Sequence, residues 1–289
     1  MTYDELRVVL PRTTALADRV LHDSEVDSTN AVARRMLMTG ELFTHVDAVD
    51  CSTTQWPMAV IVADRQREGH GRMGRTWVGS PGESSMVSYA TLVPRAVATD
   101  AHINGWLQMI AGLASAEAIV DVCAQEGCID CPVRLKWPND IMLHGRKLGG
   151  ILIELVTMPG PMVGMIFGVG INLGIPADRL PTSMSTSLQL HCMPLPDSVT
   201  LRDEIAARTV IRLRTRVRQL ADNPMQYAGV LLDEMKSMCL TLGRQVEARL
   251  VDGTTVRGKA VALNPDASLT VLDASGTVHV ITTGDVGVL

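Results

Sequence analysis

Residues 150–171 read GILIELVTMPGPMVGMIFGVGI, which is two apolar runs separated by the turn residues MPGP. Short apolar runs bounded by Gly and Pro are typical of buried strands. The stretch therefore predicts a β-hairpin of two buried strands, 150–156 and 163–171. Similar runs predict strands at 58–64 and 84–93, and a short strand is expected within 19–28. Residues 133–136, VRLK, lead into WPND, where Pro138 ends regular pairing.

Helical periodicity appears between and after these strands. Apolar residues recur at steps of three and four over 101–125, where Asp100 is the expected N-cap. A second helix is expected after Thr200, which together with Asp203 resembles a capping box, and a third over 224–240. The second helix carries many arginines. Because the chain is acidic overall, we expect a solvated face there rather than a nucleic-acid surface.

The sequence pattern changes at Leu242. From 244 to 289 no helical period remains, and short alternating strands are separated by the turn signals DGT, NPDAS and DASG. This pattern predicts an α+β protein of two domains, a larger one over 1–241 and a small SH3-like β-barrel over 242–289.

Composition limits the function classes. The 289 residues are 46% hydrophobic, enough for a sizeable core, and the formal net charge of -5 argues against a dedicated DNA-binding protein. The N-terminus lacks a signal-peptide pattern, and no apolar run is long enough to span a membrane. We therefore expect a cytoplasmic protein that binds neither DNA nor membrane.

Three of the six cysteines crowd the stretch CAQEGCIDC, at Cys123, Cys128 and Cys131. Three thiolates could be ligands of a zinc ion. No Cys or His follows at zinc-finger spacing, however, so the sequence favours free thiols in a reducing compartment.

Residues 69–77, GHGRMGRTW, match two nucleotide-binding patterns: G-x-G-x-x-G and, except for Arg75 in place of Lys, the P-loop. Both patterns require a helix to begin inside the motif. The following RTWVGSPGESS has no apolar period, and no acidic residue stands about 20 residues further on to bind a ribose. We expect neither motif, but an arginine-rich loop whose planar side chains bind phosphate or carboxylate.

Three more stretches combine charged or amide side chains with turn residues. They are KWPND at 136–140, RKLGGILIE at 146–154, and GVGINL at 168–173, which ends a strand at Asn172. Buried polar groups of these kinds need partners or a ligand. Together with the arginine-rich loop they indicate a ligand site.

These stretches, with DSTN at 27–30, occur in the order and approximate spacing of biotin protein ligases, which the chain resembles from about Val20 onward. The resemblance implies a mixed-sheet catalytic domain of the biotin/lipoate ligase type. It implies that ATP, with Mg²⁺, and biotin form biotinyl-5′-AMP, and that biotin passes to a lysine of a biotin carboxyl carrier domain. A lipoate or octanoate ligase, from a related family, is the alternative.

The resemblance also implies roles for particular residues. Lys136 and Arg72 are the expected catalytic cations. The expected biotin pocket comprises Ser28, Thr29, Asn30, Gln66, Gly71, Arg72 and Lys136. The expected ATP and adenylate contacts are Arg72, Arg75, Trp77, Asp140, Lys147, Asn172 and Arg244. No fixed protein metal site is implied, and Mg²⁺ would come with ATP, near Asp140.

The chain departs from the family pattern in the arginine-rich loop. The family loop usually reads G-R-G-R-x-G-R, but here His70 replaces the first Arg and Glu68 precedes the motif. Both lower the positive charge near the ligand, so we expect the adenylate to be held less tightly than in relatives with the full Arg set. The segment before Asp27 is too short for the helix-turn-helix domain of some family members. We therefore expect a ligase that does not bind operator DNA, as a monomer or weak dimer.

Overall fold

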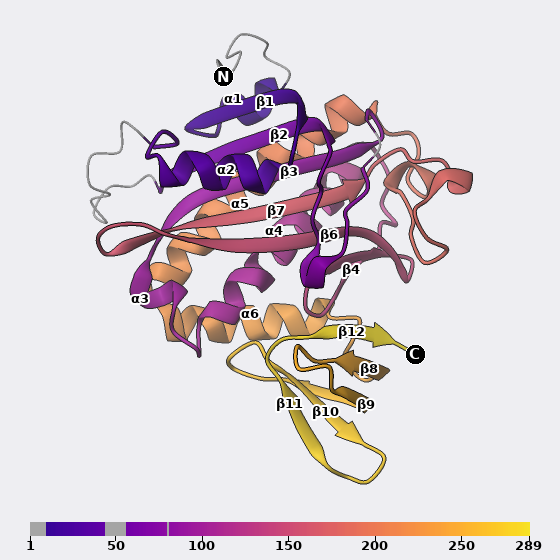
Figure 1. The fold of residues 1–289 in the computed structure, drawn as a ribbon. Coiled ribbons are helices and arrows are strands. Elements are labelled where there is room, and N and C mark those ends of the chain that lie inside the picture. Colours follow the sequence, from indigo (N-terminus) through magenta and orange to yellow (C-terminus); the bar gives the residue numbers. More distant parts are fainter. Residues whose placement is uncertain (1–9, 44–55, 80) are drawn as a thin grey trace.

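The computed structural model describes residues 10–43, 56–79 and 81–289, which form two sheets with helices on both faces of the larger one (Figure 1). The larger sheet has seven strands in the order β1-β2-β3-β7-β6-β5-β4. β1 and β2 are parallel, and the other neighbours are antiparallel. The strands are β1 (Arg19–Val26), β2 (Met58–Gln66), β3 (Ser84–Pro94), β4 (Val133–Lys136), β5 (Asp140–Leu143), β6 (Arg146–Thr157) and β7 (Met162–Asn172). The predicted α+β, mixed-sheet class is confirmed.

The hairpin predicted from residues 150–171 is confirmed as β6 and β7, and β6 begins four residues earlier than expected, at Arg146. β7 lies at the centre of the sheet, between β3 and β6. The register places Gly150 directly opposite Gly170. Two glycines side by side leave a flat area of backbone on the sheet, and this area becomes part of the wall of the pocket described below.

Helices cover both faces of the large sheet (Figure 1). α2 (Thr29–Met38) packs on one face, while α4 (Asn104–Gln125) and α5 (Ser198–Asp222) pack on the other. Each face of the sheet has its own hydrophobic core, and alternate residues of β2 point into one or the other. Ile61 packs on the α2 side, and Val60 packs on the α4 and α5 side. The remaining helical segments are α1 (Pro11–Thr14), α3 (Arg95–Ala98), α6 (Pro224–Met238) and the 3₁₀ turns η1 (Arg72–Gly74), η2 (Ala177–Arg179) and η3 (Leu188–Leu190).

The predicted start of α4 is wrong. The helix begins at Asn104, because the Asp100 carbonyl accepts hydrogen bonds from the N–H groups of Ile103 and Asn104 in a separate turn, and the Asp100 carboxylate accepts from His102 N–H at 2.8 Å. In the described part of the chain, α4 alone is long and apolar enough to cross a membrane, but 78% of its most apolar window is buried inside the molecule. The apolar character of α4 therefore follows from its packing in the core, beneath the sheet.

The predicted capping box of α5 is also wrong. α5 begins at Ser198, and the Asp197 carboxylate accepts hydrogen bonds from the N–H groups of Val199 and Thr200. Asp197 therefore satisfies the first free N–H groups of the helix before Thr200 can. The buried Asp203 carboxylate instead accepts from the N–H and hydroxyl groups of Thr13, which fastens α1 to α5.

The predicted solvated arginine face of α5 is wrong at its two buried arginines. Arg216 forms ion pairs with Glu117 of α4 and with Glu234 of α6. Arg202 binds the Asp64 carboxylate of β2 at 2.8 Å. These arginines join the helices to one another and to the sheet, so they offer no free charge to a nucleic acid.

The second sheet contains five antiparallel strands in the order β11-β10-β9-β8-β12. They are β8 (Gln245–Arg249), β9 (Thr255–Leu263), β10 (Leu269–Asp273), β11 (Val278–Ile281) and β12 (Asp285–Val288). The sequence predicted the first four, and β12 was missed. Two tryptophans of the large domain donate to backbone carbonyls of the small one, Trp106 to Pro265 and Trp137 to Ala267. The domain boundary at 241/242 stays a prediction.

Candidate active site

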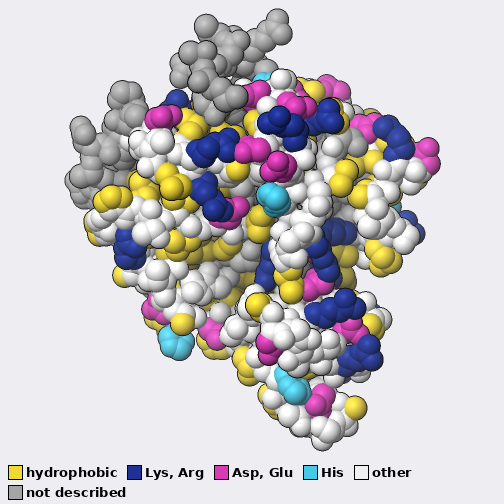
Figure 2. Space-filling view, in the orientation of Figure 1, with side chains coloured by type: hydrophobic (Ala, Val, Ile, Leu, Met, Phe, Trp, Pro, Cys, Tyr) yellow, Lys and Arg dark blue, Asp and Glu magenta, His cyan; other side chains and the backbone are white. Residues whose placement is uncertain are grey.

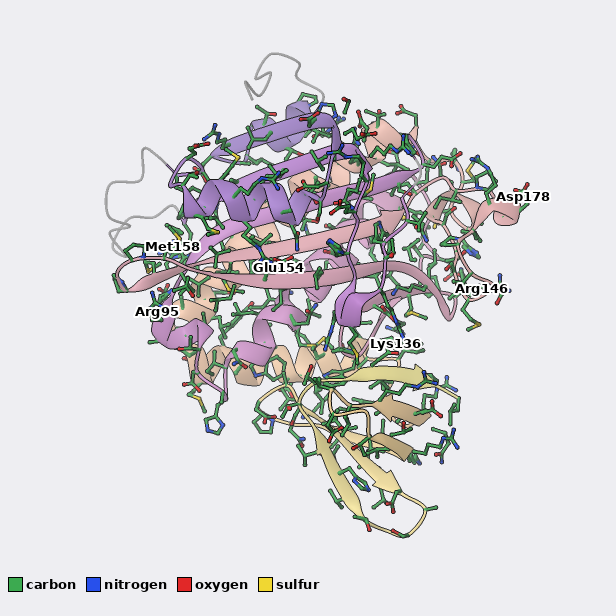
Figure 3. The ribbon with its side chains drawn as sticks, in the orientation of Figure 1. Arg95, Lys136, Arg146, Glu154, Met158 and Asp178 are labelled. Carbon is green, nitrogen blue, oxygen red and sulfur yellow. The ribbon has the colours of Figure 1, made fainter. Side chains whose placement is uncertain are left out.

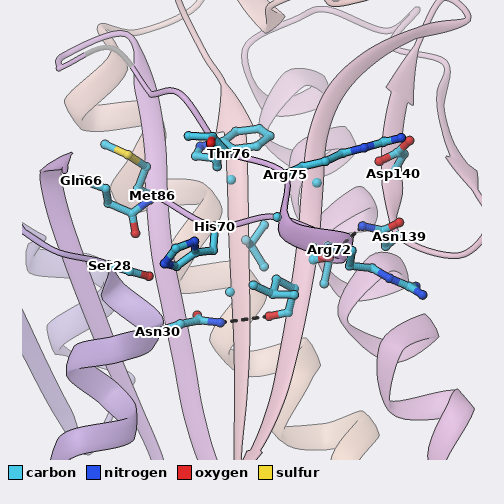
Figure 4. A pocket seen from close by; sticks show the side chains of 18 of the residues that line it. Ser28, Asn30, Gln66, His70, Arg72, Arg75, Thr76, Met86, Asn139 and Asp140 are labelled. Carbon is cyan, nitrogen blue, oxygen red and sulfur yellow. Dashed lines mark hydrogen bonds between the residues drawn. The ribbon is translucent and has the colours of Figure 1, made fainter. Parts of the chain in front are cut away.

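A pocket opens where β6 and β7, the N-terminus of α2, the loop 69–77 and the start of β12 meet (Figure 4). Its volume is about 840 Å³ including the open mouth, which is the size of a small-molecule site. Figure 2 shows Lys and Arg side chains beside a hollow between the large and the small domain. Figure 3 places Lys136 at this junction and Glu154 on the sheet. The pocket therefore lies between the domains, with the sheet as its wall.

The loop 69–77, called the arginine loop below, folds back on itself. Trp77 N–H donates to Gly69 O at 2.8 Å, and Gly71 N–H donates to Arg75 O at 2.7 Å. Only the single 3₁₀ turn η1 forms within the loop, and the next element is the strand β3. No helix begins in the glycine motif, so the rejection of both nucleotide motifs is confirmed.

Trp77 lies across the two facing glycines of the sheet. A Cβ atom added to Gly170 would stand 2.4 Å from Trp77 Cε2, and one added to Gly150 would stand 3.5 Å from Cζ3. Glycine is therefore required at Gly170 for this placement of the indole. The indole N–H is buried and has no protein partner. Such a donor is unusual away from a ligand or water.

Hydroxyl and amide groups gather at one end of the pocket, called the amide end below. Ser88 Oγ lies 2.6 Å from Asn30 Oδ1 and 2.7 Å from Thr29 Oγ1. Asn30 Nδ2 donates to Glu154 Oε1 at 2.9 Å, and Thr29 N–H donates to Gln66 Oε1 at 2.8 Å. The amide end thus combines donors and acceptors with little net charge.

Cations gather at the other end, called the cationic end below. Arg72 donates to Thr283 Oγ1 at 2.9 Å, and Arg75 forms an ion pair with Asp285. Both partners belong to the small domain, next to or within β12. The small domain therefore supplies an acidic and a hydroxyl partner to the arginine loop.

Asp140 holds two lysines of the cationic end. Its Oδ1 lies 2.6 Å from Lys147 Nζ and its Oδ2 lies 2.7 Å from Lys136 Nζ, which also donates to Val286 O at 2.7 Å. Burial alone would raise the pKa of Asp140, but the two ammonium groups lower it below 3.8 overall. Each carboxylate oxygen is bound by one lysine, and the expected position of ATP-bound Mg²⁺ near Asp140 stays a prediction.

The lowered pKa of Asp140 gives a testable dependence of stability on pH. The ionised carboxylate should stabilise the fold fully above its ordinary pKa of 3.8 and lose that effect as the pH falls through the lower folded value. We expect Asp140→Asn to lower the free energy of unfolding by about 3 kcal/mol at pH 7, and by less below pH 3.8. Urea titrations across this range measure the effect.

Asp233→Asn is the control for this experiment, because the Asp233 side chain is 82% exposed on α6. It should leave the free energy of unfolding nearly unchanged. A loss in Asp140→Asn that stays the same from pH 7 to pH 3 would contradict the stabilising role of the ionised carboxylate.

Comparison with known proteins identifies the family. Residues 46–172 match the family model described as "Biotin/lipoate A/B protein ligase family". The biotin–[acetyl-CoA-carboxylase] ligase of Mycobacterium tuberculosis is 30% identical over 227 residues, which are 78% of this chain and 77% of that protein. The chain belongs to the biotin protein ligase family. A further family member, biotin–protein ligase 2 of Arabidopsis thaliana, is 30% identical over 62% of this chain but only 51% of its own length.

The fold agrees with that of the family. The biotin protein ligase of Aquifex aeolicus, solved in complex with biotin and ATP, superposes with a TM-score of 0.66 over 94% of this chain and 100% of the other. Its sequence identity is 22%, so the likeness bears on the fold alone. It supports a biotin protein ligase architecture for both domains.

Most of the residues expected at the ligase site line the pocket. They are Ser28, Thr29, Asn30, Gln66, Gly71, Arg72, Arg75, Trp77, Asp140 and Lys147. Lys136 lies just behind the wall and reaches the pocket through Asp140. The roles assigned to these residues stay predictions.

Asn172 and Arg244 do not line this pocket. The Asn172 amide donates to Thr186 O at 2.9 Å, because β7 ends there and the following loop folds back over it. Arg244 is exposed in the turn before β8, where its carbonyl accepts from Ala260 N–H. Their expected contacts with adenine and ATP gain no support from the geometry.

Four contributing residues were missed by sequence reasoning. Asn139 holds the backbone of Ile151 through its amide and carbonyl, and it lies inside the quoted motif KWPND. Ser88 and Glu154 are polar positions within otherwise apolar strands, a signal that could have drawn attention to them. Asp285 carries no such signal, because only the fold brings the small domain to the arginine loop.

Proposed function

We propose that this protein is an ATP-dependent biotin ligase that forms biotinyl-5′-AMP and transfers biotin to a lysine of a biotin carboxyl carrier domain. The observation that carries the proposal is one pocket with a nearly neutral amide end, a cationic end and the Trp77 indole lying on Gly150 and Gly170. Biotin needs both ends, because its ureido ring is neutral and its carboxylate must meet a polyanion. The proposal agrees with the name of the Mycobacterium tuberculosis relative and with the ligands of the Aquifex aeolicus structure.

The residues act by positioning and charge compensation. The hydroxyl and amide groups of Thr29 and Asn30 hold the ureido ring, which offers one acceptor and two donors, and the buried Ser88 hydroxyl fixes both side chains from behind. The biotin carboxylate then attacks the α-phosphorus of ATP, and pyrophosphate leaves. Arg72 lines the pocket and holds the two anions together, and Lys136, behind the wall, adds its positive charge through Asp140 and so stabilises the charge that develops. Mg²⁺ bound to ATP would neutralise phosphate charge, and no residue is assigned to hold it.

In the second step the ε-amine of the carrier lysine attacks the acyl carbon of biotinyl-5′-AMP, and AMP leaves. The mixed anhydride is reactive, so the pocket must keep it from water until the carrier arrives. The arginine loop, closed by its own backbone hydrogen bonds, covers this region. We also propose a cytoplasmic location, where acyl-CoA carboxylases would be the source of the carrier, and a monomeric or weakly dimeric state.

Label transfer tests the proposal. The protein is incubated with ATP, Mg²⁺, radiolabelled biotin and an apo carrier domain, and the label on the carrier is measured. Parallel reactions with radiolabelled lipoate and octanoate and their apo carrier domain test the alternative. Transfer of biotin supports the proposal, whereas transfer of lipoate without biotin would overturn it.

His70 offers a prediction about the lifetime of the adenylate. His70 is exposed and lines the pocket beside the amide end (Figure 4). Replacing it by arginine adds a permanent cation near the ligand. We expect His70→Arg to slow the release of biotinyl-5′-AMP by about fivefold, because an added charge contact contributes about 1 kcal/mol. Stopped-flow dissociation measures the rate, and equal rates in the two proteins would show that position 70 does not hold the adenylate.

A further inference from the structure

Three cysteine sulfurs meet beneath the sheet, outside the pocket. The Sγ atoms of Cys123, Cys131 and Cys192 all lie within 4.8 Å of one another. Cys123 and Cys192 are fully buried, and Cys131 is 7% exposed. Nothing in the proposed ligase reaction uses them.

The three cysteines come from separate parts of the fold. Cys123 lies in the last turn of α4, Cys131 lies two residues before β4, and Cys192 follows η3. The sequence alone does not show that these cysteines are neighbours, because the whole β4–β7 segment lies between Cys131 and Cys192. The free-thiol expectation considered only partners at zinc-finger spacing, and the fold supplies one from much farther along the chain.

A fourth cysteine lies beside this group. Cys128 is partly exposed on the segment between α4 and Cys131, and its thiol donates to Asp130 O at 4.0 Å. Cys128 and Cys131 are separated by two residues, a spacing common among zinc ligands. Among the described residues, Cys239 is the remaining cysteine and lies outside the group, and Cys51 lies outside the described residues.

We propose that Cys123, Cys131 and Cys192, with Cys128 as the fourth ligand, bind one structural Zn²⁺ ion. Zinc takes four thiolates at about 2.3 Å, which places the sulfurs about 3.8 Å apart at the corners of a tetrahedron. Three sulfurs within 4.8 Å of one another already approach this arrangement. Each thiol loses its proton on binding, so no oxidant or reductant is needed.

The geometry favours a single ion over an iron–sulfur cluster. The spacing C-x₄-C-x₂-C followed by a distant Cys also occurs in plant-type ferredoxins. A two-iron cluster divides its cysteines between two metals, however, whereas three sulfurs here share one small volume. A closed, buried site of this kind also suits a structural ion better than a catalytic one.

The ion would support the cationic end of the pocket. Cys192 ends a loop that holds the backbone of Lys147, through Lys147 N–H to Met184 O and Thr186 N–H to Lys147 O, both at 2.8 Å. Fixing Cys192 to α4 and to the start of β4 ties this loop to the same strand that carries Lys136. Zinc therefore links the elements that position both lysines.

Metal analysis tests the proposal without any ligase assay. The full chain is purified untagged, with a phosphine reductant and no chelator, from zinc-supplemented cells. We expect about one zinc per wild-type chain. Each of Cys123→Ser, Cys131→Ser and Cys192→Ser should hold less than about 0.1 zinc per chain. Loss of a residue that only hydrogen-bonds to a ligand lowers metal affinity about 10- to 100-fold, and loss of a ligand itself lowers it by far more. Cys239→Ser is the matched control, because Cys239 is a buried cysteine outside the group, and it should keep its zinc.

A second measurement avoids variants that fail to fold. Wild-type protein stripped with a chelator should melt at a lower temperature, recover on addition of ZnCl₂, and with Co²⁺ show the thiolate charge-transfer absorption of a tetrahedral site. In Cys128→Ser this spectrum should change, and an unchanged spectrum would remove Cys128 as the fourth ligand. No zinc and no cobalt uptake in reduced wild type, a disulfide between these cysteines, or iron with sulfide would each overturn the proposal.

Discussion

Lys136→Ala should slow the formation of biotinyl-5′-AMP by about 100- to 1000-fold while the protein remains folded. Removing one group that stabilises charge in a transition state costs about 3–4 kcal/mol in comparable sites. Lys136 is suited to such a role because its position is fixed. It ends β4, its side chain is only 15% exposed, and its ammonium group bonds to Asp140 and to Val286 O.

The fixed position matters because a flexible cation would have to be ordered during the reaction. A charge already held in place costs no reorganisation when the carboxylate approaches the α-phosphate. Lys147 shares Asp140 but is more exposed, at 34%. We therefore expect Lys147→Ala to reduce the rate less than Lys136→Ala does.

Single-turnover formation of labelled adenylate measures the effect, with circular dichroism as the check on folding. Lys259→Ala is the control, because Lys259 is exposed on β9 and does not line the pocket. It should react at the wild-type rate. A folded Lys136→Ala protein that forms adenylate within about threefold of wild type would refute the catalytic assignment, since threefold is less than 1 kcal/mol.

Features that depend on local sequence patterns could be predicted from the sequence alone. The hairpin β6–β7 follows from two apolar runs and a turn, and the failure of both nucleotide motifs follows from the missing helix after Gly74. The arginine loop could be assigned to a ligand because its residue types fix its chemistry. Such features need few contacts from distant parts of the chain.

Features set by distant contacts were not predictable from the sequence. The direction of the Asn172 amide depends on a loop that returns to the end of β7, and the Asp203 carboxylate is used by α1 rather than by its own helix. Asp285 reaches Arg75 only through the docking of the small domain. Cys192 likewise joins Cys123 through the fold alone.

Two glycines of β7 should control the two substrates separately. Gly168 and Gly170 point to the same face of the sheet, since alternate residues of a strand do. A Cβ atom at Gly168 would stand 2.3 Å from Asn30 Oδ1, and one at Gly170 would stand 2.4 Å from Trp77 Cε2. Neither glycine has a positive φ, so alanine fits the backbone and the clash alone decides the result.

We expect Gly168→Ala to raise the KM for biotin by about 10- to 100-fold, because displacing Asn30 disrupts hydrogen bonds worth about 1–3 kcal/mol. Trp77 is the residue that the family resemblance places against the adenine. Gly170→Ala should raise the KM for ATP by a similar factor, because it would displace the indole and stacking on a base contributes about 1–3 kcal/mol. Each variant should leave the other KM within about threefold, a difference of less than 1 kcal/mol.

Gly164→Ala is the matched control on the same face of β7. Its Cβ would meet Leu37 Cδ1 at 2.8 Å, far from the pocket and against a side chain that can move. It should lower the melting temperature without changing either KM. If Gly168→Ala and Gly170→Ala instead raise both KM values together, biotin and ATP are not bound by separate parts of the pocket. Unchanged KM values in both would mean that neither Asn30 nor Trp77 contacts a substrate.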